Sequence, residues 1–174
     1  MNIRTPIFLI LLASLLCSCM GMPATVEPVT DFELERYLGT WYEIARLDHS
    51  FERGLDKITA NYSMRDDGGV RVLNRGWSEK DQAWDEAEGR AYFLEDPGTG
   101  YLKVSFFGPF YGSYVIFQLD KAGYDHAFVS GPDLTYLWLL SRSPDPDPAL
   151  LDRFREEAGK RGFNTGELIL VNHN

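Results

Sequence analysis

The residues able to do covalent or metal chemistry are few in this chain of 174 residues, and they are far apart. The three histidines are His49, His126 and His173, and none has a neighbouring Ser and Asp arrangement that would activate a nucleophile. Three isolated histidines without a usable thiol also lack the ligand spacing of a zinc site. We interpret His49 and His173 as solvated side chains. The sequence therefore predicts no catalytic residue, no metal and no cofactor, and it indicates that the protein is not an enzyme.

Both cysteines lie at the end of an N-terminal segment with a secretory pattern. Arg4 carries a positive charge, residues 7–16 form an apolar run, and small residues follow that run. The run is too short to span a bilayer well. A helix of the folded core is the alternative interpretation of the same residues.

The four residues 16–19, Leu-Cys-Ser-Cys, resemble a bacterial lipobox. The resemblance implies cleavage before Cys19 and attachment of lipid to its thiol and amine. Met20 rather than an acidic residue follows, and the bacterial sorting rule then implies the outer membrane, with the domain facing the periplasm. The predicted boundaries are a lipoprotein signal peptide at 1–18, a lipidated cysteine and tether at 19–30, and a folded domain at 31–174.

The composition is typical of one globular domain with an acidic surface. The formal net charge is −9, the pI is near 4.8, and 44% of the residues are hydrophobic. A chain of this length is long enough to bury a core, and a single domain is the prior expectation. The composition excludes nucleic-acid binding, because phosphate neutralisation needs clustered Lys and Arg that the sequence lacks. Small neutral or cationic ligands are compatible with this charge.

From Thr40 onward the sequence alternates in short segments separated by turn signals such as DDGG, DPGTG and SGPD. This spacing predicts an all-β fold, an antiparallel up-and-down sheet that closes into a β-barrel. Eight strands is the number at which a barrel holds one small ligand. The eight predicted strands span residues 40–47, 57–64, 70–77, 84–94, 101–107, 113–119, 126–131 and 135–141, and a last short strand spans 167–171.

Two helices are predicted to flank the strands. Thr30 and Glu33 fit a capping box, which predicts a short helix or 3-10 turn over residues 30–38. Asp147 as the N-cap and Gly162 as the terminating residue bound a second, C-terminal α-helix with one apolar face. We expect this face to pack on the outside of the barrel. Its residues are Leu150, Leu151, Phe154 and Ala158.

The two ends of the predicted barrel carry a family resemblance. The stretch LGTWYE at 38–43 matches the Gly-x-Trp motif that opens lipocalins, and LLSR at 139–142 matches the arginine motif that closes their eighth strand. The middle motif of the family is degenerate here, at 119–124. Residues 39–54 and 103–112 resemble bacterial lipocalins of the outer-membrane lipoprotein type. The chain thus resembles the lipocalin family from about residue 31 to residue 171.

The resemblance implies a structural role for the residues at the closed base of the barrel, which are Gly39, Trp41 and Arg142, with Arg142 packed across the Trp41 ring. Because side chains alternate along a strand, an inward Trp41 also places Glu43, Ala45 and Leu47 inside. A carboxylate in that place must be paired or neutral. Arg142 is the candidate partner of Glu43, and a solvated position caused by a local bulge is the alternative.

The same alternation, aligned with the lipocalin pattern, predicts a hollow interior, because small residues such as Ala87, Gly89 and Ala91 recur on the inner face of the fourth strand. The loop GPFYG lies at the open mouth, where Phe107, Phe110 and Tyr111 either line an entrance or only brace one another. The residues predicted to bind ligand in the cavity or at its mouth are Tyr62, Val72, Asn74, Ala91, Phe93, Val104, Phe106, Tyr111, Tyr114, Ile116, Tyr136, Trp138 and Leu140.

The resemblance further implies a lipid-binding and transport function, in which the barrel holds a fatty acid or a lysophospholipid and the Cys19 lipid anchors the protein to the membrane. Family members of this kind are linked to membrane maintenance or stress. The alternative hypothesis is an interaction module that docks on a membrane or a protein through the mouth aromatics. The sequence makes no prediction of the oligomeric state.

Overall fold

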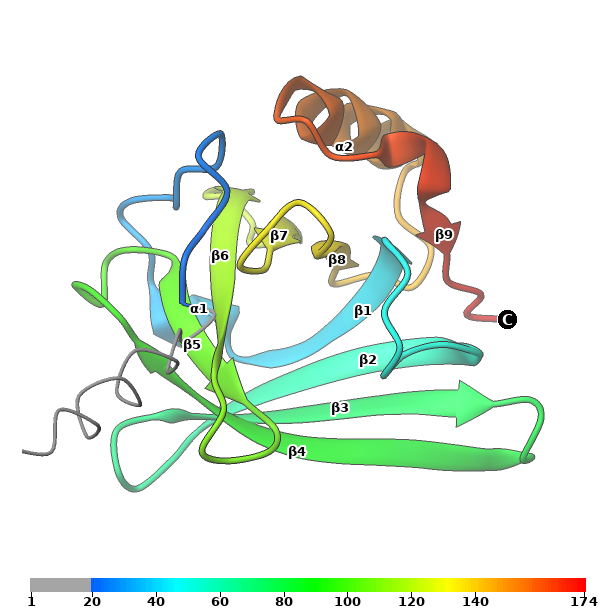
Figure 1. The fold of residues 1–174 in the computed structure, drawn as a ribbon, viewed down its shortest axis with the longest axis horizontal. Helices are drawn as coiled ribbons and strands as arrows, with labels where there is room; N and C mark the ends of the chain where they lie inside the picture. Colours follow the sequence, from blue (N-terminus) through cyan, green and yellow to red (C-terminus); the bar gives the residue numbers. More distant parts are fainter. Residues whose placement is uncertain (1–19) are drawn as a thin grey trace, which may run out of the picture.

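The short strands between the turn signals form a closed antiparallel barrel (Figure 1). The strands are β1 (Gly39–Arg46), β2 (Leu55–Met64), β3 (Val70–Ser78), β4 (Ala83–Phe93), β5 (Tyr101–Ser105), β6 (Gly112–Leu119), β7 (His126–Ser130) and β8 (Leu137–Ser141). Each strand pairs with the next one in the chain, and β1 pairs with β8 to close the sheet. The computed structural model describes residues 20–174, so the predicted signal peptide and Cys19 lie outside the described residues.

The prediction of an eight-stranded up-and-down barrel is confirmed, and the strand ends differ from the predicted ones by at most two residues. Turn side chains account for such differences. For example, β8 begins at Leu137 rather than Thr135, because the N–H of Thr135 donates to the Asp133 carboxylate at 2.8 Å. Thr135 therefore belongs to the preceding turn.

The second predicted helix is α2 (Pro148–Lys160), which lies outside the barrel (Figure 1). The Asp147 carboxylate accepts a hydrogen bond from the Ala149 N–H at 2.9 Å, which confirms its role as N-cap. Gly162 follows with a φ of +91°, in the region that favours glycine. Within residues 20–174, no helix combines the length and the apolar character needed to cross a membrane. The buried residues of α2 are Leu150, Phe154 and Ala158.

The chain after α2 returns to the barrel and adds a short strand to it. A 3-10 turn (Thr165–Glu167) leads into β9 (Ile169–Leu170), which pairs with Ala45 and Arg46 of β1. The predicted last strand is therefore present but shorter than expected, because its first residue belongs to the 3-10 turn.

The N-terminal segment contains α1 (Leu34–Tyr37), and the predicted capping box at its start is wrong. The Thr30 hydroxyl donates to the Asp31 carboxylate, and Glu33 makes no side-chain cap bond. A tertiary partner replaces the box, since the N–H of Glu33 donates to the hydroxyl of Tyr124 at 2.9 Å. Local spacing cannot reveal a partner that lies 91 residues away.

Strand β1 contains an irregularity between Glu43 and Ala45, where its pairing with β8 shifts register. One extra residue moves every later side chain to the other face of the sheet. The prediction that Ala45 and Leu47 face the interior is therefore wrong, because both are buried in the outer core that α2 covers. Arg46 is buried beside Glu43 instead.

Strand β4 extends beyond the segment that pairs with β5. Only Arg90–Phe93 pair with β5, and residues 83–88 are exposed. Figure 1 shows β3 and β4 reaching a hairpin away from β5 and β6. Ala87 lies on this exposed part, so the prediction that it faces the hollow is wrong.

The closed end of the barrel is covered by Trp41 and Arg142. The guanidinium carbon of Arg142 lies 3.9 Å from the centroid of the Trp41 ring. Its N–H groups also donate to three carbonyl oxygens of the segment 36–40 at 2.8–3.0 Å. Gly39 adopts a φ of +92° within this segment, a conformation that L side chains rarely adopt. The Arg142 guanidinium thus connects the Trp41 ring to the backbone of residues 36–40.

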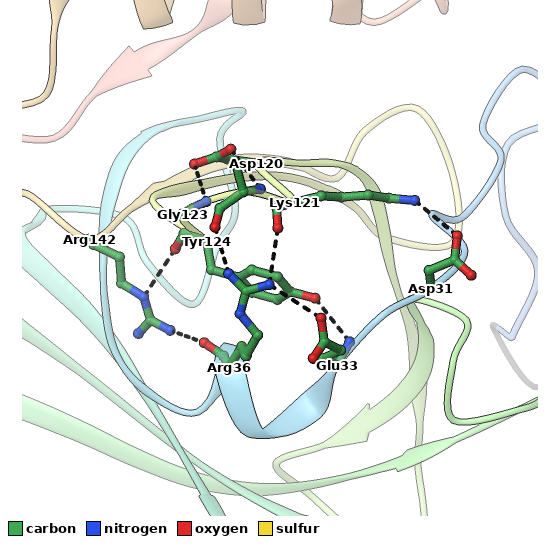
Figure 2. A network of polar contacts seen from close by, with 9 residues as sticks. Asp31, Glu33, Arg36, Asp120, Lys121, Gly123, Tyr124 and Arg142 are labelled. Atoms are coloured by element: carbon green, nitrogen blue, oxygen red, sulfur yellow. Dashed lines mark hydrogen bonds and ion pairs between the residues drawn. The ribbon is translucent and has the colours of Figure 1, made fainter.

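A polar network ties the N-terminal segment to the turn between β6 and β7 (Figure 2). The Arg36 guanidinium donates to the carbonyl oxygens of Lys121 and Ala122 at 3.1 and 2.7 Å, and it lies 4.2 Å from the Tyr124 ring centroid. The Asp120 carboxylate accepts hydrogen bonds from backbone N–H groups of the same turn. The degenerate middle motif therefore forms a well-bonded turn that supports the base.

Candidate ligand-binding cavity

A cavity of about 320 Å³ lies inside the barrel and is open at the mouth. This volume is near the lower end of the range of small-molecule pockets, roughly 300–1,000 Å³. The short side chains of Ala60 and Ala91 leave the space, since neither reaches the centre of the barrel. The predicted residues that line the cavity are Tyr62, Val72, Asn74, Ala91, Val104, Phe106, Tyr114, Tyr136, Trp138 and Leu140.

Two residues predicted to bind ligand, Phe93 and Ile116, pack in the inner core instead of lining the cavity. Ile116 is fully buried, and its carbonyl accepts a hydrogen bond from the Val29 N–H at 2.8 Å. Phe93 packs edge-on against Phe32, with ring centroids 6.1 Å apart. The N-terminal segment covers both residues, because it lies across this end of the barrel. Their side chains belong to the inner core rather than to the cavity wall.

Tyr111 also lies away from the cavity. Its hydroxyl accepts a hydrogen bond from Arg90 Nε at 3.0 Å, and the Lys103 ammonium lies 5.0 Å from its ring centroid. Lys103 alternates with the cavity-lining Leu102 and Val104 on β5, so it points to the outer face. The predicted mouth position of Tyr111 is therefore wrong, because two cations hold its ring on the outside of the sheet.

Phe107 and Phe110 lie at the tip of the same loop, and their side chains are 77% and 76% exposed. Neither residue lines the cavity. Phe51, from the loop between β1 and β2, is 56% exposed and does line it. The aromatic residue at the cavity entrance is thus Phe51, while the two phenylalanines of the GPFYG region project into solvent.

Sequence reasoning missed the residues that the N-terminal segment adds to the cavity wall. Phe32, Leu34 and Tyr37 all line the cavity, although none belongs to a barrel strand. A signal was present, since three large apolar residues within six positions of a polar segment must be covered by something. Strand alternation could not place them, because they lie outside the strands.

Two carboxyls on the cavity wall contact one buried guanidinium. Arg46 donates to Glu43 Oε1 at 3.1 Å and to the backbone carbonyl of Glu52 at 2.9 Å, and its Nε lies 3.9 Å from Glu52 Oε2. All three side chains are buried, and both glutamates line the cavity. The predictions that Glu43 pairs with Arg142 or is solvated are therefore both wrong. Its partner is Arg46, which the β1 irregularity turns toward the interior.

Burial raises the pKa values of the two carboxyls, and the one cation that they share opposes the rise. Burial raises the pKa of Glu43 well above its usual value, and the neighbouring Glu52 adds to the rise against the opposite effect of Arg46. Burial likewise raises the pKa of Glu52, although the Trp138 indole N–H, 3.2 Å from Glu52 Oε2, opposes it. Two buried carboxyls beside one guanidinium favour a state in which one carboxyl keeps its proton.

His49 is buried at the cavity mouth, so its interpretation as a solvated side chain is wrong. Its ring stacks on Tyr136 and on Phe51, with centroid distances of 5.0 and 5.4 Å, and lies 4.7 Å from Trp138. Burial, followed by the positive charge of Arg46, lowers the pKa of His49 to about 4. The imidazole is therefore neutral near pH 7 and serves as part of an aromatic stack.

His173 is likewise engaged, because its Nε2 lies 2.8 Å from the carbonyl oxygen of Glu43. Its ring also packs edge-on against Tyr42 at a centroid distance of 5.5 Å. Among residues 20–174, no group of three His, Cys, Asp or Glu side chains is placed to hold a metal ion.

Three tyrosines form a hydrogen-bonded chain across the cavity. The hydroxyl of Tyr114 on β6 lies 2.7 Å from the hydroxyl of Tyr37 and 2.9 Å from the hydroxyl of Tyr62 on β2. The Tyr37 ring packs against Trp41 at a centroid distance of 4.7 Å, so this triad is next to the closed base. Burial raises the pKa of all three phenols, which are therefore neutral hydrogen-bonding groups.

Comparison with known sequences gives a consistent result. Residues 32–173 match the family described as Lipocalin-like domain. The chain is 62% identical over 165 residues to the protein named Outer membrane lipoprotein Blc of Vibrio cholerae, covering 95% of this chain and 96% of that one. It is 50% identical over 155 residues to the protein of the same name in Escherichia coli, covering 89% and 87%.

A more distant relative and a solved structure extend the comparison. Temperature-induced lipocalin-1 of Arabidopsis thaliana is 33% identical over 154 residues, covering 82% of this chain and 80% of that one. The crystal structure of insecticyanin from the tobacco hornworm Manduca sexta superposes with a TM-score of 0.70 at 20% identity, covering 88% and 87% of the two chains. At that identity the match concerns the fold alone.

Proposed function

The chain belongs to the lipocalin family, and from this premise we propose that it holds one single-chain lipid, a fatty acid or a lysophospholipid, in its barrel cavity. The observation that supports the proposal is the apolar cavity of about 320 Å³, which opens at the mouth and is walled by aliphatic and aromatic side chains. Such a space suits one acyl tail inside, with a polar group close to the few polar residues of the wall.

Burial of an acyl tail in the cavity provides enough free energy for micromolar or tighter binding. Burying roughly 14 methylene groups at ~0.8 kcal/mol each contributes about 11 kcal/mol before costs. Association and ordering of the chain subtract several kcal/mol. The remainder corresponds to micromolar or tighter binding. A lipid with two acyl chains needs a wider space than this cavity offers.

We further propose that the protein acts at the outer membrane, anchored through a lipid on Cys19 and facing the periplasm. Two relatives that cover most of this chain carry the name Outer membrane lipoprotein, and the lipobox-like residues 16–19 agree with such an anchor. Mass spectrometry of the purified protein is the test. We expect an N-terminus at Cys19 that carries acyl chains, whereas an intact Met1 contradicts the anchor.

Binding rather than catalysis is the proposed activity. Lipocalins are binding proteins, and the titratable groups at this cavity are held in fixed pairs or stacks. Glu43 and Glu52 contact Arg46, and His49 is neutral and stacked on aromatic rings. None of these groups is arranged with a nucleophile in the way that acyl transfer requires.

Titration of the purified, delipidated protein with a fluorescent fatty acid tests the proposed ligand class. We expect saturable binding at one site per chain, and competition by unlabelled lysophospholipid. Mass spectrometry of lipids that copurify under native conditions provides an independent measurement. Absence of saturable binding by either lipid would refute the proposal.

A docking function at the mouth is the second candidate, and the exposure of Phe107 and Phe110 favours it. The double substitution Phe107→Ser with Phe110→Ser removes both exposed rings and leaves the cavity wall unchanged. Loss of vesicle binding by the anchor-free protein, with unchanged fatty-acid affinity, is the result that a docking role predicts. Unchanged vesicle binding excludes it.

A further inference from the structure

We propose that Tyr37, Tyr62 and Tyr114 form a hydrogen-bond-donating site for the ligand, which takes an uncharged acceptor oxygen such as an ester carbonyl or a hydroxyl. The inference rests on the proposed function and adds a polar specificity to an otherwise apolar cavity. All three side chains line the cavity, and they come from the N-terminal segment, β2 and β6. We call them the tyrosine triad.

A count of hydrogens carries the argument. Three phenols bring three hydroxyl hydrogens, and the two hydrogen bonds that join them, at 2.7 and 2.9 Å, use two of these. In every arrangement of donors along the chain, one hydrogen remains. The hydroxyls of the triad have no further hydrogen-bond partner among residues 20–174.

The remaining hydrogen lies in a place where leaving it unpaired is costly. Tyr37 and Tyr62 are buried and Tyr114 is partly buried, and no described acceptor outside the triad lies within hydrogen-bond distance of its hydroxyls. A buried donor without a partner loses its hydration and gains nothing in return. An acceptor oxygen on the ligand would fill this place, at the inner end of the cavity beside Trp41.

The charges around the cavity favour an uncharged acceptor over an ionised one. The described residues that line the cavity include Glu43, Glu52 and Asp133 but no Lys, Arg or His. Two cations lie nearby, and both are engaged. Arg46 contacts the two glutamates. Arg142, whose charge opposes the rise that burial causes in the pKa of Tyr37 and of Tyr62, lies over the Trp41 ring and donates to three carbonyl oxygens. After burial, Glu43 and Glu52 also raise the pKa of Tyr62, which indicates that their negative potential reaches the triad. An ionised carboxylate at this point therefore lacks a counter-charge.

A series of C18 ligands with different end groups tests whether the triad donates a hydrogen bond. We would measure displacement of the neutral probe phenylnaphthylamine by methyl oleate, oleyl alcohol, oleate and cis-9-octadecene, which share the cis-9 C18 chain and differ only at one end. We expect methyl oleate and oleyl alcohol to bind about 3- to 10-fold more tightly than octadecene, the worth of one net hydrogen bond. Oleate at pH 8 is expected to gain no advantage over the alcohol. Equal affinity of ester, alcohol and octadecene overturns the inference.

Substitutions test the hydrogen count itself. The triple change of Tyr37, Tyr62 and Tyr114 to Phe removes every hydroxyl and leaves no partner half-satisfied, so the fold is expected to persist. It should abolish the preference for ester and alcohol over octadecene. Tyr114→Phe alone should keep the preference, because it frees the hydrogens of the other two phenols. Tyr111→Phe, outside the cavity, is the matched control and should change nothing.

The outcomes separate the possibilities. A triple variant that retains the preference, or a Tyr114→Phe variant that loses it, contradicts the site. If the triple variant fails to fold, the infrared carbonyl stretch of methyl oleate bound to the unchanged protein decides. A shift to lower frequency than in hydrocarbon solvent supports the hydrogen bond, and no shift overturns it. If none of the ligands displaces the probe, the proposed lipid-binding function fails, rather than only this inference.

Discussion

Glu43 and Glu52 are two buried acidic groups beside one buried basic group, Arg46, and the pH dependence of stability should report this imbalance. The pKa of Glu43 is raised in the folded state, so its favourable contribution is complete below about pH 4.5 and is lost as the pH rises through the raised value. We expect Glu43→Gln to become more stable relative to the unchanged protein as the pH rises. Denaturant unfolding at several pH values measures this, and a pH-independent difference contradicts it.

The effect of His49 on the pH dependence of stability has the opposite sign to that of Glu43. The pKa of His49 falls from 6.5 to about 4 on folding, so its contribution is present above pH 6.5 and is lost as the pH falls toward 4. The size of the loss is about 3 kcal/mol in the free energy of unfolding. His49→Phe keeps an aromatic ring in the stack, and it should reduce the fall in stability between pH 7 and pH 4. Equal acid sensitivity of both proteins would refute the assignment.

Arg142 contacts both the Trp41 ring and the backbone of the N-terminal segment at the base of the barrel. Its guanidinium lies over Trp41 and donates to three carbonyl oxygens of the segment 36–40. We expect Arg142→Met to lower the free energy of unfolding by about 2–4 kcal/mol, because three carbonyl oxygens lose a charged donor and the Trp41 ring loses its cation. Lys80→Met, an exposed change of the same type, is the control for thermal unfolding. Equal shifts for both variants would contradict a structural base.

At the scale of elements, α2 and the β1 irregularity together divide the molecule into two cores. The irregularity turns Arg46 inward and sends Ala45 and Leu47 outward, under the helix. The outer core beneath α2 thereby becomes larger, and the cavity gains its polar wall from Glu43. One register shift in a single strand thus affects both stability and the chemistry of the interior.

Phe154 is the element-scale test. It is fully buried between α2 and the outer face of the sheet, 4.9 Å from the ring centroid of Phe128. We expect Phe154→Ala to cost about 3–5 kcal/mol of unfolding free energy, while the ligand affinity of the folded protein stays the same. Arg155→Ala, exposed on the same helix, should cost little. A loss of ligand affinity without a loss of stability would show that the two cores are not separate.

At the scale of the whole molecule, the cavity exists because strands with small inward residues close around it. Ala91 lies on β4 where the strand is part of the closed barrel, and it lines the cavity. Ala87 lies on the same face of the same strand, four residues earlier, where β4 projects beyond β5 and is exposed. The two alanines thus differ only in whether the barrel encloses them.

This pair provides a matched prediction for the cavity. Ala91→Phe fills space inside the barrel, and we expect fatty-acid affinity to fall about tenfold or more, because the ring occupies the volume of the acyl tail. Ala87→Phe adds the same ring in solvent and should leave the affinity unchanged. Titration with a fluorescent fatty acid compares them, and equal affinity of both variants would place the ligand outside the cavity.

Much of this protein follows from local sequence. Strand number, turn positions and the capped α2 helix depend on spacing, turn chemistry and alternation, which act over a few residues. The base residues Gly39, Trp41 and Arg142 are implied by the family resemblance of the motifs at 38–43 and 139–142. Ten of the residues predicted for the cavity wall line it. Eight of them lie in strands, where alternation holds as long as the strand is regular, and Phe106 and Tyr136 lie next to a strand end.

Only the tertiary structure decided where alternation fails and which distant groups meet. The β1 irregularity gave Glu43 the partner Arg46, the N-terminal segment placed Tyr37 against Trp41 and within the tyrosine triad, and two outer cations turned Tyr111 away from the mouth. The register of β1 against β8, and the packing of the N-terminal segment on the barrel, depend on contacts between residues far apart in the chain. Their energies arise only after the barrel has closed, so no local pattern encodes them.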